Sequence, residues 1–502
     1  MSGAVGRSAT RRRHASAGPR HAASGTGRGI GRGSVALEAL AVAALAALIG
    51  LWRPGAATIG PDETVYRASG LAYVTGDLTP NPEHPPLAKM LMGLWQLAFG
   101  EGIVSVRGLM GLVLVATAVV AFLWLRAALG RAEALTAAAL LITMHRVAGA
   151  DFVDRQVSLD PFAVLFGVAG LALLWRWRER PTVLLAVLAG AAFACAMLSK
   201  AVGAVFLAGA LAAVPWRRLG TREVLIGIGA FAATGITVCL AAFWPFGGLD
   251  AVAAMIEFQA SHAERGHRVE IAGTVHQHAP LHAVAWLAGE TVGVLPLVGI
   301  GLGVAAACLA WRQPAARMLV VTAAATFVVL SLSPVALQHY TADWLWAAVL
   351  ASGVGVVTLW RRARGSMPML AMRVLVAAVP SALLLVGAVS GLWHVLTLEP
   401  HGVGLVDERM REDPRPDGTV LTIHVSPLIT APNIDAPVTV DPATDGITAV
   451  LVGEDVRHGA PQPALLEALD ELEQPQELDG LLLYLLDDEL DDLGLAALAV
   501  VP

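Results

Sequence analysis

Long apolar runs, which recur from Val35 to about Leu398, constrain the fold of this chain more than any other sequence feature. Most of them approach the roughly 20 residues that an α-helix needs to cross the hydrocarbon core of a bilayer. The composition agrees, because 56% of the chain is hydrophobic and only 15% is charged. We therefore expect an all-α polytopic membrane protein with about 11 transmembrane helices. The expected spans are 35–52, 109–125, 134–150, 157–175, 183–198, 201–216, 224–246, 283–309, 318–334, 342–360 and 374–398.

Basic residues indicate how these spans are oriented. The first 34 residues contain seven arginines and no acid, which is typical of a disordered arm held at the cytoplasmic face. Binding of this arm to nucleic acid is the less favoured alternative. With the N-terminus inside, every cytoplasmic connection is short and carries arginine, as the positive-inside rule requires. These arginines are Arg126, Arg131, Arg176, Arg178, Arg180, Arg217, Arg218, Arg222, Arg312, Arg317, Arg361, Arg362 and Arg364.

The chain therefore divides into a basic arm (1–34), a membrane domain (35–398) and an acidic tail (399–502). From Thr397 onward the sequence holds 22 Asp and Glu against four Arg, a balance of −18. Because the whole chain carries −6, the remainder carries +12. A tail so acidic favours a solvated surface and argues against a nucleic-acid partner.

The tail also contains patterns of regular structure. Residues 419–425 and 448–452 alternate as short strands do, whereas 464–472 and 481–493 have patterns typical of helices. We expect a small α/β domain or a partly ordered tail, and the odd number of spans predicts that it is extracytoplasmic.

With this topology, the polar side chains near the membrane gather on the outer face, where five loops converge. Asp62 and Glu63 lie there, between the first two spans. A carboxylate at this surface can act as a general base, and Asp62 is the best candidate, with Glu63 beside it. The same acids could instead favour a helix N-terminus. Asp160 is a third catalytic candidate, because an acid at the start of a span is costly unless it faces a cavity; alternatively, it caps that helix.

A second motif, Asn81-Pro82-Glu83-His84-Pro85-Pro86-Leu87-Ala88-Lys89, follows about twenty residues after the first. Its double proline excludes regular helix at His84 and fixes the backbone of the loop. An Asp-Glu pair followed by His-Pro-Pro-Leu-x-Lys resembles the protein O-mannosyltransferases, which belong to the class C, polyprenyl-phosphate-sugar-dependent glycosyltransferases. The similarity is strongest over 61–90 and weaker over 155–162 and 244–268.

This resemblance implies a class C glycosyltransferase-like site at the outer face, with Asp62 as the catalytic base. It implies transfer of a sugar, with mannose as the favoured candidate, from a polyprenyl phosphate donor to a Ser or Thr hydroxyl of an exported protein. The related aminoarabinose lipid A transferases have a similar Glu-x-Pro-Pro-Leu loop, which implies a metal-binding or donor-binding role for Glu83. They also place a histidine in the large loop after the seventh span, which His262 resembles. A divalent metal is thus a candidate cofactor, with Glu83 and His262 as candidate ligands.

The phosphate of such a donor must be met by cations close to the headgroup plane, where Arg offers a bidentate contact and Lys a point charge. His339 and Tyr340 are expected to line the site from the far side, unless Tyr340 is only an interfacial anchor. The candidate phosphate-binding residues are His84, Lys89, Arg146, Arg155, Lys200, Arg265 and Arg268.

Several functions fit this pattern. The nearest alternative keeps the donor and changes the acceptor to a cell-envelope glycolipid or glycan. A transporter or flippase would also be polytopic, but transporters place charged groups near the bilayer midplane on broken helices, whereas here they are expected at one face. A catalytically idle assembly subunit is disfavoured by the intact Asp62 and His84 motifs. The favoured hypothesis is a multi-pass plasma-membrane glycosyltransferase with its active site facing outward.

Overall fold

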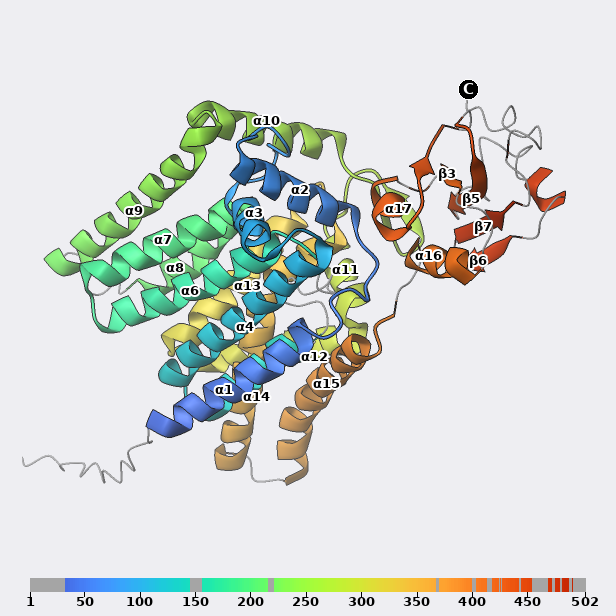
Figure 1. Cartoon of the computed structure of the whole chain (residues 1–502). Coiled ribbons are helices and arrows are strands. Elements are labelled where there is room, and N and C mark those ends of the chain that lie inside the picture. The colour runs from blue at the N-terminus through green and yellow to red at the C-terminus, as the bar shows by residue number, and fades with distance from the viewer. Residues whose placement is uncertain are drawn as a thin grey trace, which may run out of the picture.

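A bundle of apolar helices and a separate C-terminal sheet make up the chain, as seen in its computed structural model (Figure 1). Most of the predicted disordered arm, residues 1–31, lies outside the described residues. The structure describes residues 32–144, 156–214, 221–366, 370–399, 403–412, 418–423, 425, 427–441, 444–453, 468–471, 475–478, 481–486 and 490.

Every apolar run that the sequence predicts as a span contains a helix. The helices of the bundle are α1 (Arg32–Gly50), α4 (Ile103–Ala128), α5 (Arg131–Thr143), α6 (Asp160–Glu179), α7 (Val183–Ser199), η1 (Ala201–Phe206), α8 (Leu207–Ala213), α9 (Arg222–Phe243), α11 (Ala283–Val292), α12 (Val294–Ala307), α13 (Pro314–Ser331), α14 (Ala342–Ser366) and α15 (Leu370–Leu396).

The number of spans differs from the predicted eleven. Within the described residues, seven helices are long and apolar enough to cross a membrane, or eight if the bent pair α11 and α12 forms one span. The pair bends by 113° at Gly293, whose φ of 87° lies in the left-handed region. The runs at 134–150, 183–198 and 201–216 yield shorter helices in the described residues. An apolar run does not distinguish a helix that faces lipid from one packed inside the protein.

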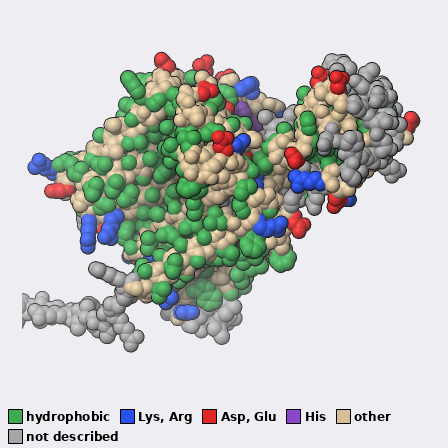
Figure 2. Space-filling model, in the orientation of Figure 1, with side chains coloured by type: hydrophobic (Ala, Val, Ile, Leu, Met, Phe, Trp, Pro, Cys, Tyr) green, Lys and Arg blue, Asp and Glu red, His purple; other side chains and the backbone are tan. Residues whose placement is uncertain are grey.

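Ion pairs between arginines and two glutamates link the helices at the end of the bundle where α1 begins. Glu38 of α1 accepts from Arg126 at 3.0 Å and from Arg131 at 2.9 Å, and Glu133 pairs with Arg361. Lys and Arg side chains gather at the lower left end of the bundle, and Asp and Glu side chains along its upper edge (Figure 2). That the arginine-bearing end faces the cytoplasm stays a prediction from the sequence.

A layer of shorter elements covers the opposite end of the bundle (Figure 1). Its helices come from the loops that the sequence predicts to be on the outer face, and they carry half of the candidate site residues. The elements are α2 (Pro61–Thr75), α3 (Leu87–Phe99), α10 (Leu249–Arg265), the antiparallel strands β1 (Val269–Ile271) and β2 (Thr274–His276), and the 3₁₀ turn η5 (Gln338–Thr341).

Two glycines allow α2 and α3 to pack closely. A Cβ atom on Gly70 would lie 2.4 Å from the carbonyl oxygen of Lys89, and one on Gly93 would lie 1.9 Å from the carbonyl oxygen of Gly70. Neither neighbour is a flexible side chain, so any larger residue would push the helices apart. This contact fixes the start of α3, and with it the loop of residues 81–86, against α2.

The C-terminal part forms a five-stranded sheet of order β4-β3-β5-β7-β6. The strands predicted at 419–425 and 448–452 are confirmed by β3 and β5. The helix predicted over 481–493 is wrong at its start, because Leu481–Leu485 is a strand between β5 and β6. A short, continuously apolar run has no period that separates a buried strand from a helix. The elements are α16 (Val403–Glu412), β3 (Thr419–Ile423), α17 (Pro427–Asn433), β4 (Val438–Thr439), β5 (Ile447–Gly453), β6 (Gln476–Leu478) and β7 (Leu481–Leu485).

We predict that Gly93→Ala destabilises the protein by about 1–3 kcal/mol, because the new methyl group cannot fit against the backbone of α2. The matched control is Gly108→Ala in α4, where an added Cβ would meet no atom within 4 Å. That variant should be unchanged or slightly more stable, since Ala favours helix by up to about 1 kcal/mol over Gly. Thermal unfolding of both purified variants measures the difference, and equal melting temperatures would contradict the packing argument.

Candidate active site

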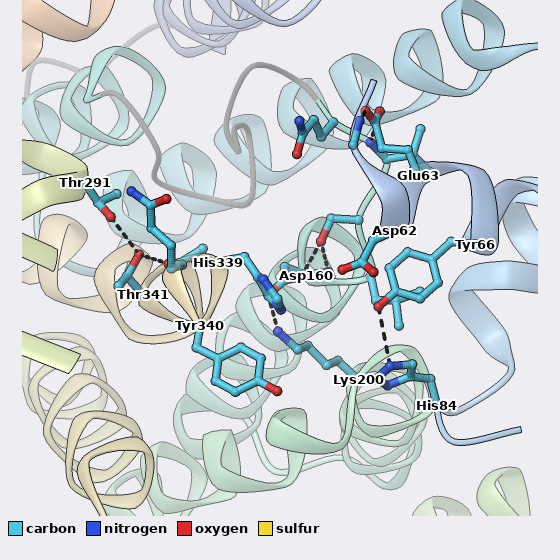
Figure 3. A pocket seen from close by; sticks show the side chains of 17 residues that line it. Asp62, Glu63, Tyr66, His84, Asp160, Lys200, Thr291, His339, Tyr340 and Thr341 are labelled. Carbon is cyan, nitrogen blue, oxygen red and sulfur yellow. Dashed lines mark hydrogen bonds and ion pairs between the residues drawn. The ribbon is translucent and has the colours of Figure 1, made fainter. Parts of the chain in front are cut away.

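A cavity of about 240 Å³ opens in the layer of shorter elements, between α2, the start of α6, and η5. The side chains of Asp62, His84, His339 and Tyr340 surround the same space (Figure 3). The sequence-predicted residues that line this cavity are Asp62, Glu63, His84, Asp160, Lys200, His339 and Tyr340. The other lining residues are Gly60, Tyr66, Gln156, Val157, Ser158, Leu159, Thr291, Gln338, Thr341 and Ala342.

Asp62 offers a carboxylate that is open to the cavity. It lies in the first turn of α2, and no other described residue donates a hydrogen bond to it. The surrounding protein removes much of its water, and this desolvation, followed by the nearby charge of Asp160, raises the pKa of Asp62 above its ordinary value of 3.8. A carboxylate without a partner and with a raised pKa is a suitable proton acceptor.

Glu63 is engaged on both oxygens, although it also lines the cavity. Arg107 of α4 donates to it from Nε at 2.8 Å and from Nη2 at 2.6 Å, and the two side chains are 1% and 0% exposed. The backbone amides of Gly60 and Val157 donate to the same carboxylate at 2.8 and 2.7 Å. Four hydrogen bonds leave Glu63 little freedom to accept a proton, so its contacts favour a role in holding α2 over direct catalysis.

A lysine between two carboxylates forms the floor of the site. Lys200, at the junction of α7 and η1, donates to Asp160 at 2.5 Å and to Asp343 at 2.9 Å. Its ammonium also lies 4.8 Å from the centre of the Tyr340 ring. The three charged side chains come from α6, the α7–η1 junction and α14, so the pairing joins three parts of the bundle.

His84 presents a neutral imidazole to the cavity. Burial, and then the charges of Lys89 and Lys200, lower the pKa of His84 to about 3. Its Nε2 lies 3.4 Å from the hydroxyl of Tyr66, whose own pKa is raised by burial. His84 can therefore share a hydrogen bond with a substrate near neutral pH, but it adds no positive charge there.

Lys89, a predicted phosphate ligand, does not line this cavity. Its ammonium is buried behind the loop and donates to the backbone oxygen of Asn81 at 2.5 Å, to the side-chain oxygen of Asn81 at 3.0 Å and to the backbone oxygen of His84 at 3.0 Å. Asn81 has a φ of 52°, a left-handed conformation that Asn tolerates. Burial lowers the pKa of Lys89 to about 7. Through these contacts, Lys89 stabilises the loop that carries His84.

A second cavity of about 350 Å³ lies on the other side of Lys200. It shares His84, Lys200 and Tyr340 with the first cavity, and it also contains the predicted residues Glu83 and His262. The backbone oxygen of Glu83 accepts a hydrogen bond from Gln259 of α10 at 3.0 Å, which ties α10 to the loop.

The remaining predicted cations are not brought into these cavities. Arg265 and Arg268 are exposed at the end of α10 and beside β1, and neither lines either cavity. Arg146 and Arg155 lie outside the described residues. Among the described residues, Lys200 is the single Lys or Arg that lines the two cavities.

The described residues do not fit a metal ion held by the protein alone. They contain no group of three or more His, Cys, Asp or Glu side chains that could hold one. Glu83 and His262 line the same cavity, but one oxygen of Glu83 already accepts from Asn81 at 2.6 Å. We derive no step that involves a metal.

Sequence analysis missed three residues that build the site: Arg107, Tyr66 and Asp343. A signal existed for Asp343, because it is an acid inside the apolar run 342–360, and charged residues in spans are rare and functional. Arg107 precedes the run 109–125 and could have been noticed in the same way. Nothing in the sequence distinguishes Tyr66 from an ordinary helix residue.

Comparison with known proteins agrees with this architecture. Residues 96–255 match the family described as PMT, dolichyl-phosphate-mannose-protein mannosyltransferase. This match covers less than half of the chain and agrees with the family that the sequence motifs resemble, although the matched range begins after the Asp62 and His84 motifs. No curated protein matches the sequence.

Two solved structures show the fold. The crystal structure of ArnT from Cupriavidus metallidurans bound to undecaprenyl phosphate is 17% identical, with a TM-score of 0.54 over 90% of this chain and 97% of that one. AglB, an oligosaccharyltransferase from Archaeoglobus fulgidus in complex with an inhibitory peptide and a dolichol-phosphate, is 11% identical, with a TM-score of 0.50 over 84% of this chain and 70% of that one. The chain is thus a multi-pass membrane protein with a class C glycosyltransferase fold.

The two adjacent carboxylates should respond oppositely to neutralisation. Glu63→Gln removes the charge that Arg107 pairs with, and breaking a buried ion pair from one side costs about 3–5 kcal/mol. Asp62→Asn should leave the melting temperature unchanged or higher, because partial desolvation and the nearby charge of Asp160 disfavour the ionised form of Asp62. Thermal unfolding of the two purified variants at neutral pH is the measurement. Equal destabilisation of both would mean that Asp62 also has a structural partner.

Proposed function

We propose that this protein transfers mannose from a polyprenyl phosphate to a Ser or Thr hydroxyl of exported proteins. The observation that carries the proposal is the carboxylate of Asp62, which has no hydrogen-bond partner among the described residues and opens into a cavity that Lys200 also lines. The class C fold and the partial match to the mannosyltransferase family support a glycosyltransferase, and the similar structures of ArnT and AglB contain undecaprenyl phosphate and a dolichol-phosphate, respectively.

In the proposed reaction, Asp62 accepts the proton of the acceptor hydroxyl. The acceptor oxygen forms a bond to C1 of the sugar, the bond between C1 and the phosphate oxygen breaks, and its electron pair leaves with the lipid phosphate. A positioned base of this kind contributes about 10²- to 10⁴-fold. His84 and Tyr66, which line the same wall, are placed to orient the sugar or the acceptor by hydrogen bonds.

The leaving phosphate needs more positive charge than Lys200 supplies. Lys200 is already paired with Asp160 and Asp343, so these three side chains together carry a net negative charge when both acids are ionised. An anionic donor therefore requires a further cation. Arg155, one of the seven predicted phosphate ligands, is the cation that we propose for this role, because it directly precedes Gln156 in the sequence, and Gln156 lines the cavity.

An apolar groove beside the site can take the lipid tail of the donor. It has a volume of about 610 Å³, lies between α7, α9 and α10, and reaches Pro85 and Ala201, which border the second cavity. A further apolar pocket of about 480 Å³ continues from it and shares Leu207 and Phe231. In the proposed function, the second cavity and this groove hold the donor, and the cavity that contains Asp62 receives the acceptor.

The acceptor is the least constrained part of the proposal. The alternative is transfer from the same donor class to a cell-envelope glycolipid or glycan, and the Glu83-His84-Pro85-Pro86-Leu87 loop favours it as much as it favours a protein acceptor. Membranes of a strain that lacks the gene, supplied with the purified protein and radiolabelled polyprenyl-phosphate mannose, separate the two. Label in exported proteins supports the proposal. Label confined to lipid or glycan would mean that the acceptor is a glycolipid or glycan instead.

Asp62→Asn should lower the rate of transfer in this assay by about two to four orders of magnitude, while donor binding remains. In the parent, activity should fall as the pH drops through the raised pKa of Asp62, because protonation removes the base; this acid limb should lie above the ordinary value of 3.8. The residual activity of Asp62→Asn should not show this loss at low pH. Near-parental transfer by Asp62→Asn, with transfer lost in Asp160→Asn, would assign the base to Asp160.

Filling the apolar groove should impair long-chain donors selectively. Ala232→Trp places a large side chain in the groove, whereas Ala233→Trp, the matched control, changes an exposed neighbour on α9 that does not line it. With a long-chain polyprenyl-phosphate mannose, Ala232→Trp should raise the donor KM about tenfold or more, the equivalent of one or two lost methylene contacts. A two-isoprene donor should be used equally well by both. Equal KM values of Ala232→Trp and Ala233→Trp for the long-chain donor would show that the groove does not bind the donor tail.

A further inference from the structure

The C-terminal domain touches the membrane domain close to the site. Asn433, the last residue of α17, bonds to both backbone groups of Ile59: the amide of Ile59 donates to Oδ1 at 2.7 Å, and Nδ2 donates to the carbonyl of Ile59 at 2.9 Å. These residues are 374 positions apart in the sequence. Figure 1 shows α17 beside the chain that leads into α2.

The segment that Asn433 holds leads directly to Asp62. Ile59 is followed by Gly60, which is the N-cap of α2 and lines the cavity, and Asp62 lies in the first turn of that helix. From the other side, Arg107 donates to the carbonyl oxygens of Ala57 at 2.8 Å and Thr58 at 3.0 Å. The strap of residues 57–60 is therefore held between an arginine of the membrane domain and an amide of the C-terminal domain.

We propose that Asn433 is a positioning residue, through which the C-terminal domain fixes the start of α2 and so the carboxylate of Asp62. The inference rests on the proposed function of Asp62 as the base. Paired donation and acceptance, as between two strands, determine both the position and the rotation of the Ile59 peptide. Since displacements of about 1 Å can reduce catalysis about 100-fold, a loose strap would impair transfer without removing any group that touches a substrate.

The side-chain chemistry predicts which substitutions matter. Asn433→Ala removes both hydrogen bonds. Asn433→Asp keeps an acceptor for the Ile59 amide, but at neutral pH its carboxylate has no proton to donate and faces the Ile59 carbonyl. When protonated, the same carboxyl group can donate again, so its defect should diminish as the pH falls.

The experiment compares Asn433→Ala with Tyr484→Phe in the full-length protein. Tyr484→Phe removes a hydrogen bond to Asp470 inside the C-terminal domain and leaves the contact to Ile59 in place. With radiolabelled polyprenyl-phosphate mannose, Asn433→Ala should lower kcat about 10- to 100-fold with less than a twofold change in donor KM. Amide hydrogen exchange should quicken in residues 57–66. Tyr484→Phe should change neither.

A pH series gives the second readout. Relative to the parent at each pH, the activity of Asn433→Asp should rise as the pH falls, whereas that of Asn433→Ala should stay low throughout. Parental kcat and unchanged exchange at 57–66 in Asn433→Ala would overturn the inference, as would an equal loss in Tyr484→Phe. If the parent transfers no sugar at all, the proposed function fails, and the exchange measurement alone then decides whether Asn433 orders the strap.

Discussion

The buried ion pair between Glu63 and Arg107 is the interaction on which the rest of the site depends. Two charges with exposures of 0% and 1% are tolerated only because every part of the pair is hydrogen-bonded: Arg107 also donates to three backbone carbonyls, and Glu63 also accepts from two backbone amides. The pair joins α2, α4 and the strap before α2 at one point. The neighbouring Asp62 has no hydrogen-bond partner in the part of the chain that the structure describes, and the stability of this corner does not rely on it.

The same reasoning applies deeper in the bundle, where Lys200 lies between Asp160 and Asp343. One cation cannot neutralise two carboxylates. The three side chains therefore keep a net negative charge, which favours the binding of a further cation or of a proton shared between the two acids. Transporters also bury charges beside broken helices, and the bent pair α11 and α12 lines the first cavity through Thr291. Here, however, the charges lie at the ends of α6 and α14, beside the outer layer, which suits a reaction at the membrane surface better than passage through it.

Sequence reasoning could predict which loops meet at the site, because span alternation assigns each loop to a face before any contact is known. The structure brings Asp62, Asp160 and Lys200, which the sequence assigns to three different outer loops, into one cavity, and their roles stay predictions. It could not predict that Lys89 points behind its loop, since that direction depends on the left-handed backbone of Asn81 and on the close approach of α2 and α3. The partners of Glu63 and Ile59 lie 44 and 374 residues away, and no local pattern encodes such pairings. The exact number of membrane spans could not be predicted for a related reason: helices buried in protein and helices buried in lipid are built from the same apolar residues.

The arrangement of the two cavities bears on how two unlike substrates could meet. An acceptor that reaches Asp62 and a donor whose tail lies in the apolar groove would approach Lys200 from opposite sides, because His84, Lys200 and Tyr340 form the wall common to both cavities. A displacement at C1 of a sugar requires the attacking oxygen and the departing phosphate on opposite faces of that carbon. Adjoining cavities that share these three lining residues, with Asp62 in one and the apolar groove next to the other, are compatible with this requirement. In the proposed reaction, the acceptor therefore attacks from the side of Asp62, and the lipid phosphate leaves toward the apolar groove.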